Sequence, residues 1–240
     1  MQKFISGMSK MYPLFIAIGV MVVLASVVIG YQNSQAAAEY FAQPKVIRET
    51  TLMAGRAAIE GTGLWLPYLK FLGLGLILSG IVMALRVIID DLQGAGNKVM
   101  SNLPEGKRPA PPSAPWYGML MPITMMMGLL IFIVALVVSL DLANIASAVF
   151  SNPIPDIDAA VAGSVLLAQV ETIHATTAWL VPLKFFGIST EFLAIVMGLS
   201  TIIYILSNQT KMIGKGIGVA RTLGRQPEKV QEDTREKVLA

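Results

Sequence analysis

The stretch Trp65-Leu-Pro-Tyr-Leu-Lys-Phe-Leu-Gly73 returns 114 positions later as Trp179-Leu-Val-Pro-Leu-Lys-Phe-Phe-Gly187. The same offset continues without a gap, and 12 of the 25 aligned pairs between residues 65 and 89 are identical. An internal repeat of fixed period indicates that one structural unit is used more than once. The sequence therefore predicts a tandem duplication, and we call two aligned residues repeat counterparts.

The first part of each repeat follows a different offset, of 109 residues. At this offset the sequence pairs Pro13 with Pro122, Gly19 with Gly128, Phe41 with Phe150 and Pro44 with Pro153. The change from 109 to 114 places about five extra residues near positions 154–159. Each unit is predicted to contain a helix, a short turn, an amphipathic stretch and a second helix.

Long apolar segments without charge place the chain in the membrane class. The chain is 55% hydrophobic and 14% charged, and residues 11–38 and 109–140 contain no charged residue. A helix needs roughly 20 apolar residues to cross a bilayer core. We therefore predict an all-α integral membrane protein with four transmembrane helices, near residues 12–31, 63–89, 117–140 and 178–206.

External amphipathic helices are expected before the second and fourth spans, at residues 46–62 and 158–176. They are predicted to continue into those spans with a bend near Pro67 and Pro182, where proline removes a backbone hydrogen bond. Trp65 and Trp179 are then expected to act as anchors at the outer membrane interface, which favours amphipathic rings. Because each half has two spans, the halves are expected to be parallel repeats related by an axis along the membrane normal.

The predicted organisation has four parts. A Pro-rich cytoplasmic linker separates the two halves, and a basic amphipathic tail follows the second half. The boundaries are 1–103 for the first two-helix repeat, 104–115 for the linker, 116–210 for the second repeat and 211–240 for the tail.

Basic residues predict the orientation, because Lys and Arg concentrate in cytoplasmic loops. The opposite loops hold only Lys45, Arg48 and Arg56. We expect a multi-pass protein of the cell (plasma or inner) membrane with both termini cytoplasmic, and contact of the tail with anionic lipid. The expected cytoplasmic side carries Lys3, Lys10, Arg86, Lys98, Lys107, Arg108, Lys211, Lys215, Arg221, Arg225, Lys229, Arg235 and Lys237.

Glu191 is the most unusual residue of the predicted spans. Its repeat counterpart is Ile77, so the duplication does not require a carboxylate there. A buried carboxylate must be paired, protonated or in contact with water. We expect an ion pair or a hydrogen bond to a neighbouring helix, with Lys70 or Lys184 as the first partner to consider. A protonatable or cation-binding site on a transport route is the alternative, and a subunit contact is the third.

A weaker pattern concerns the outer side. Glu171 and His174 stand three residues apart, as in carboxylate-bridged metal bundles. Glu60 is the repeat counterpart of His174. Convergence of the three side chains would suit zinc, copper or iron, although an ordinary polar cluster explains the same residues. No other cofactor is expected.

Several functional classes are excluded or disfavoured. The chain has no cysteine, which excludes disulfides and thiol chemistry. We find no catalytic triad or nucleotide-binding loop, and the basic balance does not indicate nucleic acid. The leading hypothesis is a non-catalytic accessory subunit that contacts lipid and other integral-membrane subunits, or itself. The alternatives are a small oligomeric transporter or channel that uses Glu191, and a metal-dependent membrane protein.

Overall fold

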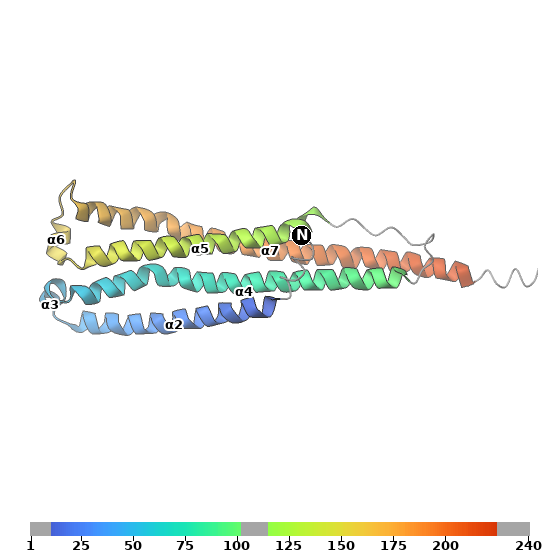
Figure 1. Ribbon diagram of the computed structural model, residues 1–240, viewed down its shortest axis with the longest axis horizontal. Helices are drawn as coiled ribbons and strands as arrows, with labels where there is room; N and C mark the ends of the chain where they lie inside the picture. Colours follow the sequence, from blue (N-terminus) through green and yellow to red (C-terminus); the bar gives the residue numbers. More distant parts are fainter. Residues whose placement is uncertain (1–10, 102–114, 225–240) are drawn as a thin grey trace, which may run out of the picture.

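The computed structural model describes residues 11–101 and 115–224, and this part of the chain contains helices and short turns but no strands (Figure 1). The first half contains two long helices with a short helix between them, and the second half has the same order. The helices are α2 (Tyr12–Ala42), α3 (Lys45–Thr50), α4 (Met53–Ser101), α5 (Trp116–Phe150), α6 (Ile154–Asp158) and α7 (Val165–Gly224).

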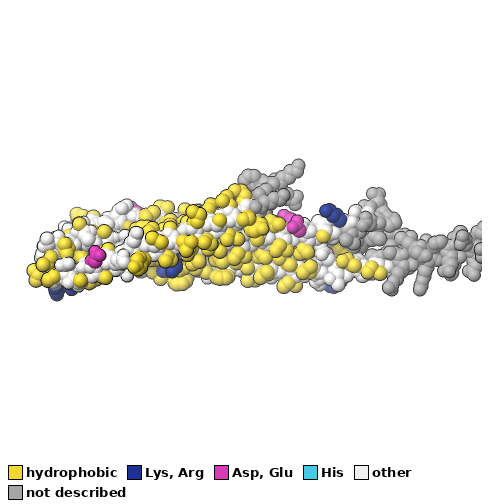
Figure 2. Space-filling view, turned by 90° about the horizontal axis from the view of Figure 1, so that it is seen from below, with side chains coloured by type: hydrophobic (Ala, Val, Ile, Leu, Met, Phe, Trp, Pro, Cys, Tyr) yellow, Lys and Arg dark blue, Asp and Glu magenta, His cyan; other side chains and the backbone are white. Residues whose placement is uncertain are grey.

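Four of these helices, α2, α4, α5 and α7, are long and apolar enough to cross a membrane. Hydrophobic side chains cover most of the middle of the face seen in Figure 2. Within a bilayer, each helix satisfies its own backbone hydrogen bonds, which an extended strand cannot do alone. The predicted fold class is confirmed at this level: the chain has the features of an all-helical, multi-pass membrane protein.

Two prolines place the short helices. Pro44 and Pro153 both have extended backbones, with ψ of 141° and 145°, and α3 and α6 begin directly after them. Proline lacks an N–H donor and favours the first positions of a helix. The chain therefore leaves the preceding long helix and starts a new helix at the equivalent place in each half.

The helix bounds differ from the predicted ones. α4 has 49 residues and α7 has 60. At 1.5 Å per residue they measure about 74 and 90 Å, against a hydrocarbon core of about 30 Å. α7 passes through the predicted boundary at residue 210 as one helix, because no proline or other helix breaker stands there. The predicted linker falls almost wholly outside the described residues, as does the tail beyond Gly224.

The two predicted amphipathic stretches are not continuous helices. In the first half, α3 ends at Thr50 and α4 begins at Met53. In the second half, residues 159–164 separate α6 from α7, and Gly163 has a φ of +85°, which a residue with a side chain rarely adopts. Pro67 and Pro182 lie inside α4 and α7, which continue on both sides of them.

The long helices form an elongated bundle in which the two halves run in the same direction (Figure 1). α2 packs along α4, and α5 packs along α7. The halves are joined by α4, which contacts both α5 and α7, whereas α2 makes at most marginal contact with α5 or α7. Two halves related by one symmetry axis would make two equivalent contacts, α4 with α5 and α7 with α2. Only the α4–α5 contact is extensive, so the packing differs from the expected symmetric arrangement.

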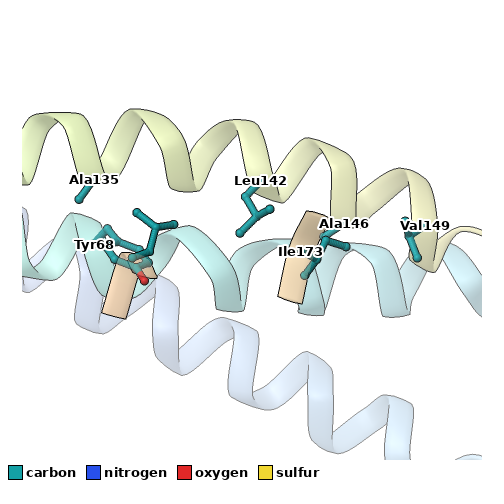
Figure 3. Packing of buried hydrophobic residues seen from close by; sticks show 7 residues of the cluster. Tyr68, Ala135, Leu142, Ala146, Val149 and Ile173 are labelled. Atoms are coloured by element: carbon teal, nitrogen blue, oxygen red, sulfur yellow. The ribbon is translucent and has the colours of Figure 1, made fainter. Parts of the chain in front are cut away.

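Two apolar clusters stabilise α4, α5 and α7 against one another. Figure 3 shows the first, in which Tyr68 of α4 and Ile173 of α7 lie beside Ala135, Leu142, Ala146 and Val149 of α5. Small residues such as Ala135 and Ala146 let the helix backbones approach closely, which favours association in lipid. The second cluster lies nearer the C-terminal ends of α4 and α7 and contains Val82, Met83, Ile89, Met121, Met125, Ala194 and Ile205.

Candidate functional site

The carboxyl group of Glu191 is enclosed between helices from both halves. Its side chain has an exposed fraction of 0%, although it stands on a membrane-spanning helix. The Ser79 hydroxyl on α4 donates a hydrogen bond of 3.0 Å to Glu191 Oε1 on α7. Ser79 is itself fully buried, so neither group exchanges this bond for water. The bond therefore links the first half to the second within the bundle.

A glycine on α5 provides the space for this carboxyl group. A Cβ atom added at Gly128 would lie 2.9 Å from Glu191 Cγ and 3.0 Å from Oε1. Any larger residue would displace the carboxyl group or separate the helices. The site is thus built from three helices: α7 supplies the acid, α4 the donor and α5 a bare backbone surface.

The second carboxyl oxygen, Oε2, is buried and has no hydrogen-bond partner. A buried polar atom left unsatisfied is destabilising, and most such atoms in folded proteins are paired. A carboxyl group accepts several hydrogen bonds when ionised and donates one when protonated. Glu191 therefore keeps capacity for one further polar partner.

The lysines predicted near Glu191 lie elsewhere. Lys184 Nζ lies 5.1 Å from the ring centre of Phe71, 5.4 Å from that of Phe185 and 5.6 Å from that of Tyr68. Such positions give cation–π attraction. Within residues 11–101 and 115–224, neither Lys184 nor the exposed Lys70 forms an ion pair with Glu191.

The expected ion pair between Glu191 and Lys70 or Lys184 is therefore replaced by the hydrogen bond from Ser79. Helical spacing placed Lys184 and Glu191 on one face, but seven residues separate them by about 10 Å along the axis. The aromatic rings beside Lys184 provide a nearer partner for its ammonium group.

The proposed metal ligands do not converge. Glu60, Glu171 and His174 are all exposed. Among the described residues, no group of three Asp, Glu or His side chains is arranged to hold a metal ion. Ile173 faces the core of the bundle with an exposed fraction of 8%. Because neighbouring helical positions point in different directions, this orientation turns Glu171 and His174 outward.

The two tryptophans differ in exposure. Trp179 has an exposed fraction of 47%, whereas Trp65 is half-buried. Their role as anchors at a membrane interface stays a prediction.

A cavity at the end of the bundle that carries α3 and α6 was not predicted from the sequence. It has a volume of about 530 Å³ and lies between α2 and α4. Most of its polar lining lies beyond the predicted end of the first span at residue 31, and Thr62 of α4 completes it. The absence of Gly and Pro from residues 31–43 was a usable signal that α2 continues past the apolar segment. The polar lining residues beyond residue 31 are Gln32, Asn33, Glu39 and Tyr40 of α2, and Gln43 directly after it.

Ser79 and Gly128 are the two site residues that sequence reasoning missed. A lone serine in an apolar helix is common, so it carried no signal by itself. Gly128 was recognised as the repeat counterpart of Gly19 and as a small residue suited to close helix contact, but it was not connected with Glu191. Comparison of the chain with protein-family models, with curated proteins and with solved structures gave no match.

Proposed function

We propose that the protein is a non-catalytic structural subunit of a larger membrane complex. The observation that carries this proposal is the enclosed Glu191 carboxyl group, which is hydrogen-bonded to Ser79 and covered by Gly128. A carboxyl group in this position joins three helices, as expected of a residue with a structural role.

The proposal includes a tandem duplication of a two-helix unit. A Cβ atom at Gly19 would lie 2.8 Å from Ile77, and one at Gly128 would lie 2.9 Å from Glu191. Gly19 and Gly128 are repeat counterparts, and so are Ile77 and Glu191. The same glycine therefore approaches the same position of the second helix in each half.

A second pair of contacts supports the same alignment. A Cβ atom at Gly73 would lie 2.8 Å from Val23, and one at Gly187 would lie 2.8 Å from Phe132. These four residues again form two pairs of repeat counterparts. Agreement at two separate contacts is what descent from one helix pair would produce.

We propose that the protein lies in the plasma or inner membrane with both termini in the cytoplasm. Thirteen Lys and Arg residues on the terminal side, against three in the opposite loops, support this orientation. On this basis the end with α3 and α6 faces outward, and the long ends of α4 and α7 face anionic lipid.

Purification from the native membrane in mild detergent tests the proposed function. We expect other integral-membrane chains to co-purify at a fixed ratio that survives a change of detergent. Recovery of this chain without any other protein would overturn the proposal. Glu191→Gln should leave the co-purifying set unchanged, because the amide oxygen still accepts the Ser79 hydrogen bond.

Transport is a second candidate, and the unpaired Oε2 of Glu191 is the observation that favours it. A free acceptor inside the membrane is a feature of proton and cation routes. Flux of protons and monovalent cations into vesicles containing the purified protein distinguishes the two functions. A structural subunit should give no flux above empty vesicles, whereas a transporter should give flux that Glu191→Gln removes.

A further inference from the structure

The junction between the halves uses different surfaces on its two sides. α4 of the first half packs against α5 of the second, but none of the helices in the described part of the chain takes the equivalent place on α7. If the halves are copies, α7 keeps the surface that α4 uses to receive α5, and α2 keeps the surface that α5 uses to bind α4. A head-to-tail contact of this kind leaves one free surface at each end.

Four positions on α4 define the receiving surface. Gly61 lies against Ser147 of α5, and Gly75 lies against the ring of Phe132. Val82 and Ile89 each have an exposed fraction of 1% and belong to a cluster with residues of the second half. This surface of α4 is therefore covered by α5 and α7.

The repeat counterparts of these positions on α7 are all exposed. Val196 has an exposed fraction of 56% and Ile203 one of 68%. The small residues Ala175 and Ser189 are exposed too. We call these four residues the open face of α7.

The two large apolar residues of the covered surface are identical in the open face, and its two glycines are replaced by other small residues. Val82 and Val196 are counterparts of the same type, as are Ile89 and Ile203. The register continues at Leu85 and Leu199, of which the first contacts Gly198 of α7 while the second has an exposed fraction of 48%. The apolar pattern is therefore shared, and only its covering helix is missing in the second half.

α2 carries the matching free surface. On α5, Ala143 and Ser147 lie against Gly61 of α4. Their counterparts on α2, Ser34 and Ala38, are exposed. α5 has twelve buried residues, whereas α2 has three, although both helices stand at the same place in their halves.

We infer that a second copy of this chain places its α2 on the open face of α7, repeating between chains the α4–α5 contact found within one chain. The inference rests on the proposed duplication. Lipid would cover large apolar side chains equally well, but it gains nothing from the small residues Ala175, Ser189, Ser34 and Ala38. Small residues on two facing helices permit close backbone contact. Since each added copy exposes a new α7, assembly continues until a ring closes or a row forms.

Cysteine cross-linking in membranes tests the contact, because the chain contains no cysteine of its own. In the equivalent internal contact, Gly61 faces Ser147, so Ala175 of one chain should face Ala38 of the next. The variant with both Ala175→Cys and Ala38→Cys should form a ladder of dimers, trimers and larger species on oxidation. Co-expression of the two single variants should form dimers and nothing larger.

Two controls keep the result specific. Ala175→Cys combined with Leu24→Cys should stay monomeric, because Leu24 is exposed but lies about 21 Å from Ala38 along α2. Gly61→Cys with Ser147→Cys should cross-link within one chain and give no ladder. The double variant Ala175→Cys with Ala38→Cys should also keep the wild-type mass by light scattering when reduced.

Three results would overturn the inference: no species above the monomer, an equal ladder from the Leu24→Cys control, or dimers from one single variant expressed alone. The last result would indicate a symmetric contact between identical surfaces. Failure of this test together with co-purification of other membrane chains would remove self-association and leave the proposed function standing. A ladder without any other co-purifying chain would support self-association and overturn the proposed function as a subunit of a larger complex.

Discussion

The two helix pairs, α2 with α4 and α5 with α7, share a close glycine contact but differ in the side chain that the glycine meets. In the first pair Gly19 lies against Ile77, and in the second Gly128 lies against Glu191. An apolar side chain needs only packing at this position, whereas a carboxyl group also needs a hydrogen-bond donor. Ser79 supplies that donor from the first half. The second pair is therefore linked to the first by a polar contact in addition to the apolar clusters.

Enlarging the glycine beneath the carboxyl group should have the largest effect. Gly128→Leu places a side chain where Glu191 Cγ and Oε1 already lie. We expect a loss of about 3 kcal/mol or more in the free energy of unfolding, because overpacking is combined with a displaced polar group. Unfolding in mixed detergent micelles measures the loss. Gly63→Leu on α4 is the control, because a Cβ atom at Gly63 meets no atom within 4 Å, and an equal loss there would contradict the special role of the second site.

Removal of the carboxyl side chain should come next. Glu191→Ala leaves a cavity and an unpaired Ser79 hydroxyl, with an expected loss of about 2 kcal/mol in the free energy of unfolding. The matched substitution in the first half is Ile77→Ala, which loses packing alone. A double-mutant cycle of Glu191→Ala with Ser79→Ala should give a coupling energy, whereas Ile77→Ala with Ser79→Ala should be additive. Additivity in both cycles would show that the hydrogen bond contributes nothing.

Loss of the donor alone should have a smaller effect. Ser79→Ala removes the hydrogen bond to Glu191 Oε1 and leaves both carboxyl oxygens without a partner. We expect about 1 kcal/mol of destabilisation, measured by the same unfolding assay. Ser139 is also fully buried but bonds to the carbonyl oxygen of Leu136 on its own helix. Ser139→Ala is therefore the control, and a larger loss there would contradict the importance of the contact between helices.

The smallest expected effect is a difference in stability between glutamine substitutions at the two repeated lysines, Lys184 and Lys70. Lys184 contacts three aromatic rings, so Lys184→Gln should lower the free energy of unfolding by about 0.5–1 kcal/mol. Lys70 is its exposed counterpart, and Lys70→Gln should have almost no effect. Lys184→Arg keeps a cation over the rings and should recover most of the loss. Equal effects of the two glutamine substitutions would indicate that the aromatic contacts are not stabilising.

The number and approximate position of the membrane helices could be predicted because they depend on local composition. Segments such as 11–38 are long and free of charged residues, which is the property that a helix needs in order to cross the hydrocarbon core. Helix ends were less predictable. α2 and α5 continue beyond their apolar segments, because no glycine or proline interrupts the chain before Pro44 and Pro153.

The partner of Glu191 could be predicted only in part. A hydrogen bond to a neighbouring helix was among the expectations, but the sequence favoured lysines over Ser79. Spacing along a helix states which residues share a face, and it gives no information on which residue of another helix stands opposite. Glu171 and His174 failed to converge with Glu60 for the same reason, since the outward direction of these two side chains depends on how α7 is rotated toward Ile173.

By itself, the sequence determined the four apolar helices, the repeat that aligns them and the presence of one carboxyl residue where the repeat has isoleucine. These properties follow from composition and periodicity along the chain. Only the tertiary structure decided that Ser79 and Gly128 enclose Glu191, and that α4 is covered on the face that α7 leaves exposed. Val82 and Val196 are the same residue at the same repeat position, yet their exposed fractions are 1% and 56%. Their difference arises entirely from which helix packs alongside.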